Sequence, residues 1–588
     1  MGWDPSEAPS RASAGPGSKL ALGALVSLVV LSPWPFGSVD PWATRTIAIV
    51  AGAAALVAIA WDAHRGVLQL AAPATWAWLG LSLLAAVQLV PLPTTLHVWL
   101  APGTAAVWHP DVREAAAVLG VGSHPISLHP EATRRWLALT VGIATLALAA
   151  APALRERRLL LRATVAIVAG GAAVALYGLV ARLVFPDRIY GVFRVPTVSP
   201  FGPFVSKNHF AGYVELAALL AVGLASGLAD EARRDKGFLS WIESRRAKWV
   251  VLAWGVAFVL VLAVLVSLSR GGVVALSAGL LAFVLLRLWS RGPSRLAPRG
   301  VLALLVLLVA GGAAVVWILP ADARVRVASL GAVTSETSGY YRLAVWRDTR
   351  RLVASSPLVG SGFGAYEDAL RRFRTASGEV AVEHAESDVL EALAEGGALA
   401  ALGLLWLVGG LVLSGLRAAR SEPQRLPRGV VSGALAGLLA LGVHSLFDFN
   451  LHLPSNALLA SALAAVLVAA ASGASSAPAS RGMVLATGAG LVLALATTWQ
   501  PAGSDAGPLL RAAPGPATSL RRAALERELV TSLRRRPADA SAWLALAWLQ
   551  ETTSGASGEP LVGWACRLDP SNSGLARAAE RLSKAASN

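Results

Sequence analysis

The chain contains very few of the residues that build disulfide-stapled domains or zinc sites. It has one cysteine (Cys566) among 588 residues, which excludes an internal disulfide and a metal site made of several cysteines. Its nine histidines show no His-Glu-x-x-His or comparable zinc spacing. Charged residues make up only 15% of the chain. This scarcity of charge is unusual for a soluble protein.

Apolar residues are abundant instead. They account for 55% of the sequence, and the mean hydropathy is +0.59, values that indicate a polytopic membrane protein. The net charge of +16 does not indicate a nucleic-acid partner, because many arginines stand in short clusters between apolar runs. That distribution follows the positive-inside rule, and it makes the lipid bilayer the expected partner.

The apolar runs predict an all-α fold of about 12–13 transmembrane helices, since one crossing needs about 20 residues. The predicted spans are 20–37, 45–61, 70–91, 136–153, 160–184, 209–229, 249–269, 271–287, 300–319, 389–415, 429–446, 457–474 and 482–499. Lys and Arg in the short loops orient the N-terminus inside. This orientation places the large loop 320–388 and the C-terminal tail outside, in the periplasm of a bacterium.

The composition divides the chain into three parts. Residues 1–19 are predicted to be a disordered cytoplasmic N-terminus, 20–499 the membrane domain, and 500–588 a linker with a small helical domain. Pro537 and Pro570 stand 33 residues apart, close to the tetratricopeptide period of about 34. The tail therefore holds either about two divergent repeats, with a protein partner, or an ordinary helical extension.

The loop 320–388 is the long polar interruption between spans. It carries nine Arg and nine Asp/Glu, and ionisable groups beside membrane spans mark candidate functional sites. Arg342, Trp346 and Arg350 share one face of a predicted helix. His384 is a candidate general base whose ring Glu386 or Asp388 would orient. The alternatives are a solvated arginine face and a histidine that only caps a helix.

Further polar residues are predicted at the same outer level. They are Arg194, Lys207, Asn208, His209, Arg270, Asp448 and His452. Asn208 is alternatively a helix N-cap, Lys207 an interfacial anchor, and Arg270 part of a plain turn. Together, however, cations and a base on one face indicate a phosphorylated lipid substrate and a proton acceptor.

Several motifs, in this order along the chain, resemble those of the O-antigen ligase/polymerase superfamily. They are Lys207-Asn-His-Phe-Ala-Gly-Tyr, Ser267-Leu-Ser-Arg-Gly-Gly, Arg342 to Gly364, His384-Ala-Glu-Ser-Asp and His444-Ser to Pro454. The resemblance implies a GT-C-like glycosyltransferase of the bacterial inner membrane. Such an enzyme moves a glycan from an undecaprenyl-diphosphate carrier to a glycan, lipid A-core or protein acceptor. The resemblance also implies that this enzyme needs no metal, cofactor or nucleotide sugar.

The resemblance assigns a role to each candidate residue. Arg270 and Arg342, with Arg194 and Lys207, would bind the diphosphate, and His384 would activate the acceptor hydroxyl. The supporting residues would be Asn208, His209, Glu386, Asp388, Asp448 and His452. Many relatives carry Asn or Gln soon after the motif histidine, where this chain has Ala385-Glu386. Rival hypotheses are a polymerase, a ligase, a protein O-oligosaccharyltransferase, a transporter or flippase of lipid-linked glycans, and an inactive assembly factor.

Overall fold

The computed structural model describes residues 14–65, 73–195, 199–232, 245–291, 337–375, 381–422, 424–471, 519–554 and 557–586. Two compact units make up the chain. The first unit comprises residues 1–78, 139–331 and 405–495, and the second comprises 79–138, 332–404 and 496–588. Helices α3 (Pro73–Val87), α7 (Pro130–Ala150) and α17 (Asp388–Ser421) contribute residues to both units.

The described residues confirm a polytopic membrane protein. Nine of their helices are long and apolar enough to cross a membrane, and two shorter apolar helices accompany them. Eleven predicted spans coincide with these helices. The predicted spans 300–319 and 482–499 lie outside the described residues. The predicted all-α class is confirmed, since the described fold is mostly helical and adds a short hairpin of strands β1 (Arg188–Ile189) and β2 (Phe193–Arg194).

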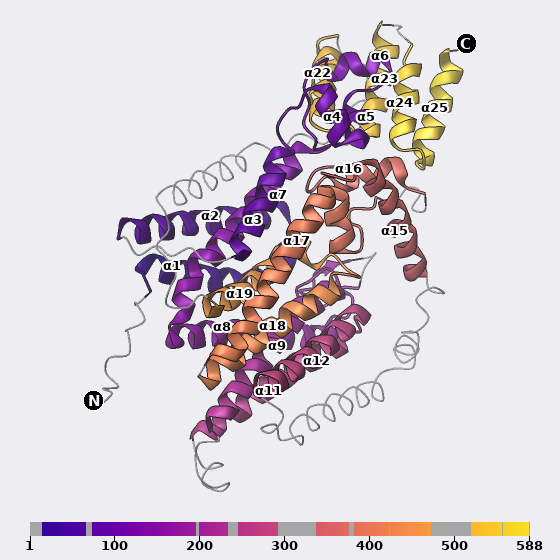
Figure 1. Cartoon of the computed structure of the whole chain (residues 1–588). Helices are drawn as coiled ribbons and strands as arrows, with labels where there is room; N and C mark the ends of the chain where they lie inside the picture. Colours follow the sequence, from indigo (N-terminus) through magenta and orange to yellow (C-terminus); the bar gives the residue numbers. More distant parts are fainter. Residues whose placement is uncertain are drawn as a thin grey trace. The chain divides into compact units, whose positions relative to one another are not determined.

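The first unit is built around a buried helix, α9 (Lys207–Ala232). Helices α8, α11, α12, α18 and α19 all pack against α9, and Figure 1 shows α11 and α12 beside α9 and α18. The helices that pack against α9 are α8 (Arg157–Val184), α11 (Arg245–Val266), α12 (Arg270–Arg291), α18 (Arg425–His444) and α19 (Pro454–Ala471). This unit also contains α1 (Pro16–Leu31), η2 (Phe36–Ser38), α2 (Pro41–His64), η3 (Ala151–Arg155) and η7 (Asn450–His452).

Small residues let α9 and α18 approach closely. Gly223 of α9 faces Gly429 and Gly433 of α18, and a Cβ added to Gly223 would lie 2.5 Å from the Gly429 carbonyl oxygen. Glycine at such a crossing brings two backbones into van der Waals contact, which is a main source of attraction between helices in lipid. The crossing therefore fixes α18 against the central helix.

The N-terminus of α1 is held by a carboxylate from α2. Asp62 accepts hydrogen bonds from the backbone N–H groups of Gly17 (2.8 Å) and Ser18 (2.9 Å). These N–H groups have no partner within the helix. A negative charge at the N-terminus also interacts favourably with the helix dipole. With this cap, helix α1 begins at Pro16.

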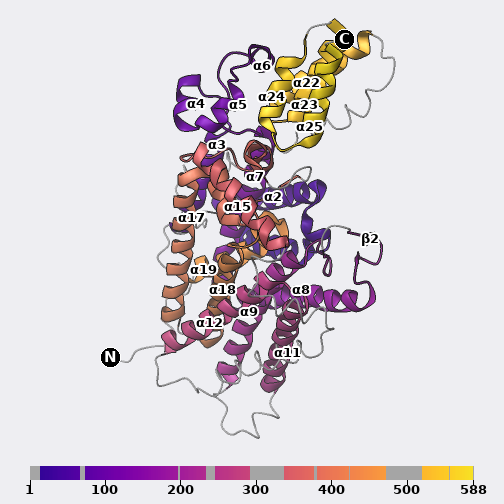
Figure 2. The same cartoon turned by 90° about the vertical axis from the view of Figure 1, so that its right-hand side faces the viewer.

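The second unit combines three segments that are distant in sequence. Residues 92–135, which connect two predicted spans, contain α4 (Thr94–Leu100), α5 (Pro102–Trp108) and α6 (Arg113–Leu119). The large loop contributes α15 (Thr337–Ser355), α16 (Tyr366–Leu370) and η6 (Arg371–Phe373). The tail forms α22 (Ser519–Arg535), α23 (Ala540–Ser554), α24 (Glu559–Leu568) and α25 (Ser573–Ala586). Figure 2 shows these tail helices lying side by side, in yellow.

Candidate functional site

The candidate base His384 lies in the loop that leads into α17. Ser387 caps this helix, because its backbone carbonyl accepts the Glu391 N–H (3.0 Å) and its hydroxyl accepts the Leu390 N–H (3.4 Å). Side chains on a helix lean toward its N-terminus. The Glu391 carboxylate therefore reaches back over the first turn toward the His384 loop.

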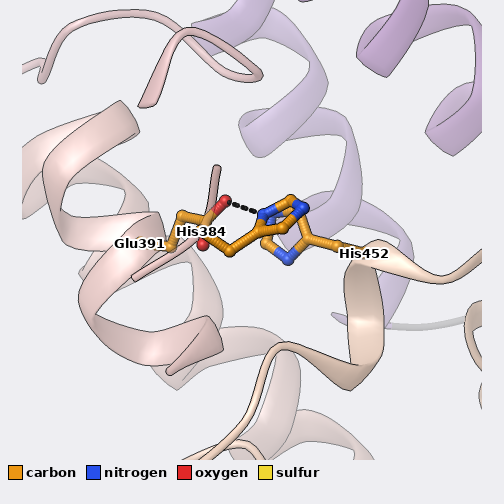
Figure 3. Close-up of side chains that lie close together, drawn as sticks. All are labelled: His384, Glu391 and His452. Carbon is orange, nitrogen blue, oxygen red and sulfur yellow. Dashed lines mark hydrogen bonds and ion pairs between the residues drawn. The ribbon is translucent and has the colours of Figure 1, made fainter. Parts of the chain in front are cut away.

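Glu391 fixes the orientation of the His384 ring. Its carboxylate lies 2.8 Å from His384 Nδ1 and also accepts the Ala385 N–H at 2.8 Å (Figure 3). Glu391 is 1% exposed, whereas His384 is half-buried. Because an ionised carboxylate can only accept, Nδ1 carries the ring proton and Nε2 is the basic nitrogen. A histidine held in this tautomer is suited to accept a proton.

His384 Nδ1 lies within hydrogen-bond distance of Glu391, a residue that the sequence analysis did not name beside Glu386 and Asp388. Glu386 instead accepts a hydrogen bond from Arg342 Nε on α15, at 3.1 Å. Its backbone is left-handed, with φ of 54°, and a non-glycine residue in this conformation is strained. Asp388 is the first residue of α17 and is buried. The predicted helix that carries Arg342 and Arg350 is confirmed as α15, where Arg350 is exposed.

A break in α17 lies just beyond Glu391. Gly397 has φ of 61° and ψ of −157°, a conformation open essentially to glycine alone. The glycine-rich loop 357–364 supplies the backbone partners that the helix loses here. Four backbone hydrogen bonds join loop and helix, and they pair Pro357 with Ala398, Leu358 with Leu399, Ser361 with Ala394, and Gly362 with Glu395. The glycine-rich loop thus forms hydrogen bonds with the backbone groups of α17 on both sides of the break.

A buried glutamine, Gln88, adds further hydrogen bonds between the glycine-rich loop and α17. Gln88, which is 0% exposed, donates from Nε2 to the carbonyl oxygens of Val359 (2.7 Å) and Glu395 (2.8 Å). Its Oε1 accepts the Phe363 N–H at 3.1 Å. An amide side chain satisfies a donor and an acceptor at once, as buried polar backbone requires. Nothing in the sequence around Gln88 indicated this role.

We predict that Gly397→Ala destabilises the protein by at least about 1–3 kcal/mol, because alanine is strained in this backbone conformation. Its Cβ would also lie 2.5 Å from the carbonyl of Leu358. Gly409→Ala in the same helix is the control, since a Cβ there meets nothing within 4 Å. Thermal unfolding in detergent measures both variants. Equal midpoints for the two would contradict this account of the break.

A second polar cluster lies at the N-terminal ends of α9 and α12; we call it the α9/α12 cluster. The Ser269 hydroxyl donates to Asn208 Oδ1 (2.9 Å) and accepts the Gly272 N–H (3.2 Å), which caps α12. Arg270 is therefore the first residue of a 22-residue helix. A guanidinium at the positive end of a helix dipole is suited to bind an anion such as phosphate.

The N-cap of α9 is Ser206 and not Asn208, which was the alternative for that residue. Ser206 caps α9, because its hydroxyl accepts the Asn208 N–H at 3.2 Å. Asn208 lies inside the first turn, and its side chain serves the Arg270 turn. Lys207 is the first residue of α9 and is half-buried. Arg194 is exposed on β2 opposite Arg188, away from the contacts that define the cluster among the described residues.

The connection between α18 and α19 contributes the rest of the α9/α12 cluster. His209 Nε2 lies 3.5 Å from Asp448 Oδ1, and the His209 ring meets the Phe449 ring edge-on. Asn456, which the sequence analysis did not name, donates to the His209 carbonyl (3.1 Å) and to Asn450 Oδ1 (3.0 Å). His452 is half-buried in η7. These contacts place Asp448, His209 and Asn208 in the α9/α12 cluster.

A fully buried ion pair lies below this cluster. His444 Nδ1 of α18 is 3.1 Å from the Glu215 carboxylate of α9, and both side chains are 0% exposed. A Cβ added to Gly271, next to Arg270, would lie 3.0 Å from His444 Nε2. Ionisable residues inside a membrane domain are costly and usually functional. The motif containing His444 was recognised from sequence, but Glu215 was not.

These features define a multi-pass membrane protein whose ionisable residues gather at the ends of its helices. Residues 255–405 match the family model described as O-Antigen ligase. This stretch includes Arg270, Arg342 and His384, so the chain carries an O-antigen ligase family domain there. The domain implies ligase- or glycosyltransferase-type activity on lipid-linked glycans. No curated protein matches the chain. The match supports the family predicted from the motifs, and it ends before Asp448 and the tail.

Proposed function

We propose that this protein is a glycosyltransferase of the bacterial inner membrane. It transfers a glycan from an undecaprenyl-diphosphate carrier to an acceptor hydroxyl on the periplasmic face. The observation that carries the proposal is the hydrogen bond between His384 and buried Glu391, within the stretch that matches the O-antigen ligase family. A ring held in one tautomer by a carboxylate is the arrangement that general-base catalysis requires.

The proposed reaction is an inverting displacement. His384 Nε2 takes the proton of the acceptor hydroxyl while the hydroxyl oxygen attacks the anomeric carbon of the glycan. The bond between that carbon and the phosphate oxygen of the carrier breaks, and the electron pair leaves with the diphosphate. Glu391 stabilises the imidazolium that forms, and solvent then removes its proton. A positioned base contributes about 10²- to 10⁴-fold to such a step.

Arginine is proposed to bind the leaving diphosphate. Arg270 begins α12, where the helix dipole adds to its charge. Arg342 uses Nε for Glu386, and its two Nη groups are the donors that we assign to phosphate oxygens. Preorganised cations that meet developing negative charge are a large catalytic term. Lys207 and Arg194 remain candidates for a more peripheral contact with the diphosphate, and Asp448 to His452 for the acceptor path.

The lipid-linked glycans of a strain that lacks this protein test the proposal. Single repeat units that remain on the carrier would identify a polymerase, and full-length polymer without its acceptor would identify a ligase. Unglycosylated protein acceptors would identify a protein O-oligosaccharyltransferase. Carrier-linked glycan trapped on the cytoplasmic face would instead identify a flippase. An unchanged glycan profile, or trapped carrier, would overturn the proposed transferase.

A further inference from the structure

The tail helices α22–α25 share a hydrophobic core with the large loop. Trp543, Leu546 and Leu568 of the tail are fully buried in the same cluster as Tyr366 and Leu370 of α16. Side chains buried together in this way are removed from water jointly, which stabilises their association. The tail is thus an integral part of the second unit.

Asp368 of α16 is the polar centre of this contact. It is 1% exposed, and two arginines and a histidine, from three segments, surround it. Arg536, just after α22, approaches to 2.9 Å, His129 before α7 to 3.0 Å, and Arg371 of η6 to 3.6 Å. Because a buried carboxylate is stable only when paired, these partners bind the three segments to one another.

The charges set the ionisation of Asp368. Burial alone would raise the pKa of this carboxyl, but the hydrogen bond from His129 and the positive charge of Arg536 lower its pKa below the usual range. Burial would lower the pKa of Arg536, and the Asp368 charge raises this pKa instead. Glu367 and Asp539 are the other acidic groups near Arg536. Asp368 is therefore ionised wherever the tail is docked.

A second buried pair holds the other end of the same short segment. Arg374 follows η6 and meets both oxygens of Asp569 at 2.9 and 3.1 Å. Its Nε donates to Ser571 at 3.1 Å. Both charged residues are nearly buried, with exposures of 7% and 5%. Both bonds to Asp569 come from Arg374 Nη2, and such charge-assisted hydrogen bonds are stronger than neutral ones. The tail thus clamps residues 366–374, which we call the α16 strip, at both ends.

The α16 strip is connected to both candidate catalytic elements. The Tyr366 N–H donates to Glu395 Oε1 at 3.1 Å, and Glu395 lies one turn beyond Glu391 on α17. The Tyr366 hydroxyl pairs with the Thr349 hydroxyl of α15 at 2.6 Å. Helix α15 carries Arg342 and the first turns of α17 carry Glu391, which holds His384. A shift of the strip would therefore move the base and the cation together.

We propose that the tail is a positioning element of the active site, and that Arg536 acts through Asp368 to hold the α16 strip. This inference rests on the proposed function. Displacing a catalytic group by about 1 Å can lower a rate by roughly 100-fold. Loss of Arg536 should consequently reduce turnover, because His384 and Arg342 shift together.

Arg536→Met, compared with wild type in liposomes that contain an undecaprenyl-diphosphate glycan and its acceptor, tests the inference. We expect kcat to fall by roughly 10- to 100-fold. Arg536→Lys should restore most of the rate, since it restores the charge. Arg535→Met is the control, because Arg535 is an exposed neighbour at the end of α22.

The pH profile separates positioning from general damage. Asp368 has a depressed pKa in the folded protein, so its contribution is present above its unfolded pKa and is lost as pH falls through the folded pKa. Without Arg536 the folded pKa rises, and the stability that Asp368 contributes, measured by thermal unfolding, should be lost at a higher pH on the acid side. Arg536→Lys should move this acid limb back.

The outcomes distinguish the inference from the proposed function. Wild-type protein without transfer activity would overturn the proposed function. An active wild type with Arg536→Met matching Arg535→Met in kcat and pH profile would overturn only the positioning role. If Arg536→Met does not yield folded protein, Asp569→Asn decides, because it removes one charge from the other end of the strip. It should lower kcat in the same way, and an unchanged kcat would contradict the inference.

Discussion

Replacing His384 by alanine is expected to lower glycan transfer by about 10²- to 10⁴-fold while the protein still inserts and folds. The ring is half-buried, so truncation removes the base without opening the core. Transfer from a carrier-linked glycan in reconstituted liposomes measures the change. Size-exclusion profiles of the purified variant establish that the protein is folded.

Glu391→Gln extends the same prediction to the residue that orients the ring. An amide has no charge to stabilise the imidazolium, and it can present an N–H to Nδ1, which favours the wrong tautomer. Transfer should fall by more than about tenfold, within the range of a positioned base. Glu383→Gln is the matched control, because Glu383 is exposed and immediately precedes His384. Equal activity of the two Gln variants would remove Glu391 from the mechanism.

The second large effect is expected at the buried pair Glu215–His444. Leucine at either position alone leaves an uncompensated ionisable group in a fully buried site. Breaking such a pair costs about 3–5 kcal/mol, a large part of a typical stability of about 5–15 kcal/mol. Thermal unfolding in detergent, followed by tryptophan fluorescence, should show a marked loss of the folded form in each single variant.

The double variant is the critical comparison for this pair. Replacing both partners by apolar residues is often neutral, so Glu215→Leu with His444→Leu should recover most of the lost stability. The recovery is the coupling energy of a double-mutant cycle. If the losses of the two single variants simply add, the two side chains do not stabilise one another and the assignment of this pair is wrong.

The membrane helices could be predicted from sequence because apolar length is a local property. A run of about 20 apolar residues specifies a span without reference to the rest of the chain. Helix ends were less predictable. The start of α1 depends on Asp62, 45 residues away from Gly17, and the Asn208 side chain serves a turn at Ser269 rather than its own helix.

The candidate site was predictable as a set of residue types, but its pairings were not. His384 and Arg342 were identified from their motifs, whereas the partner of His384 was assigned to the nearest carboxylates. Glu391 is seven residues away and reaches the ring only because Ser387 starts the helix where it does. The contact of Asp368 with Arg536 joins residues 168 apart, a separation that no local pattern can reveal.

The Glu215–His444 pair also constrains how the protein is made. The two residues are 229 positions apart, so at about 5–20 residues per second the ribosome finishes α18 roughly 10–45 s after α9. During that interval α9 has to reside in or beside the bilayer with a carboxyl group whose partner does not yet exist. The pair can therefore form only after α18 has been synthesised, later than the rest of the packing around α9 that precedes it in sequence.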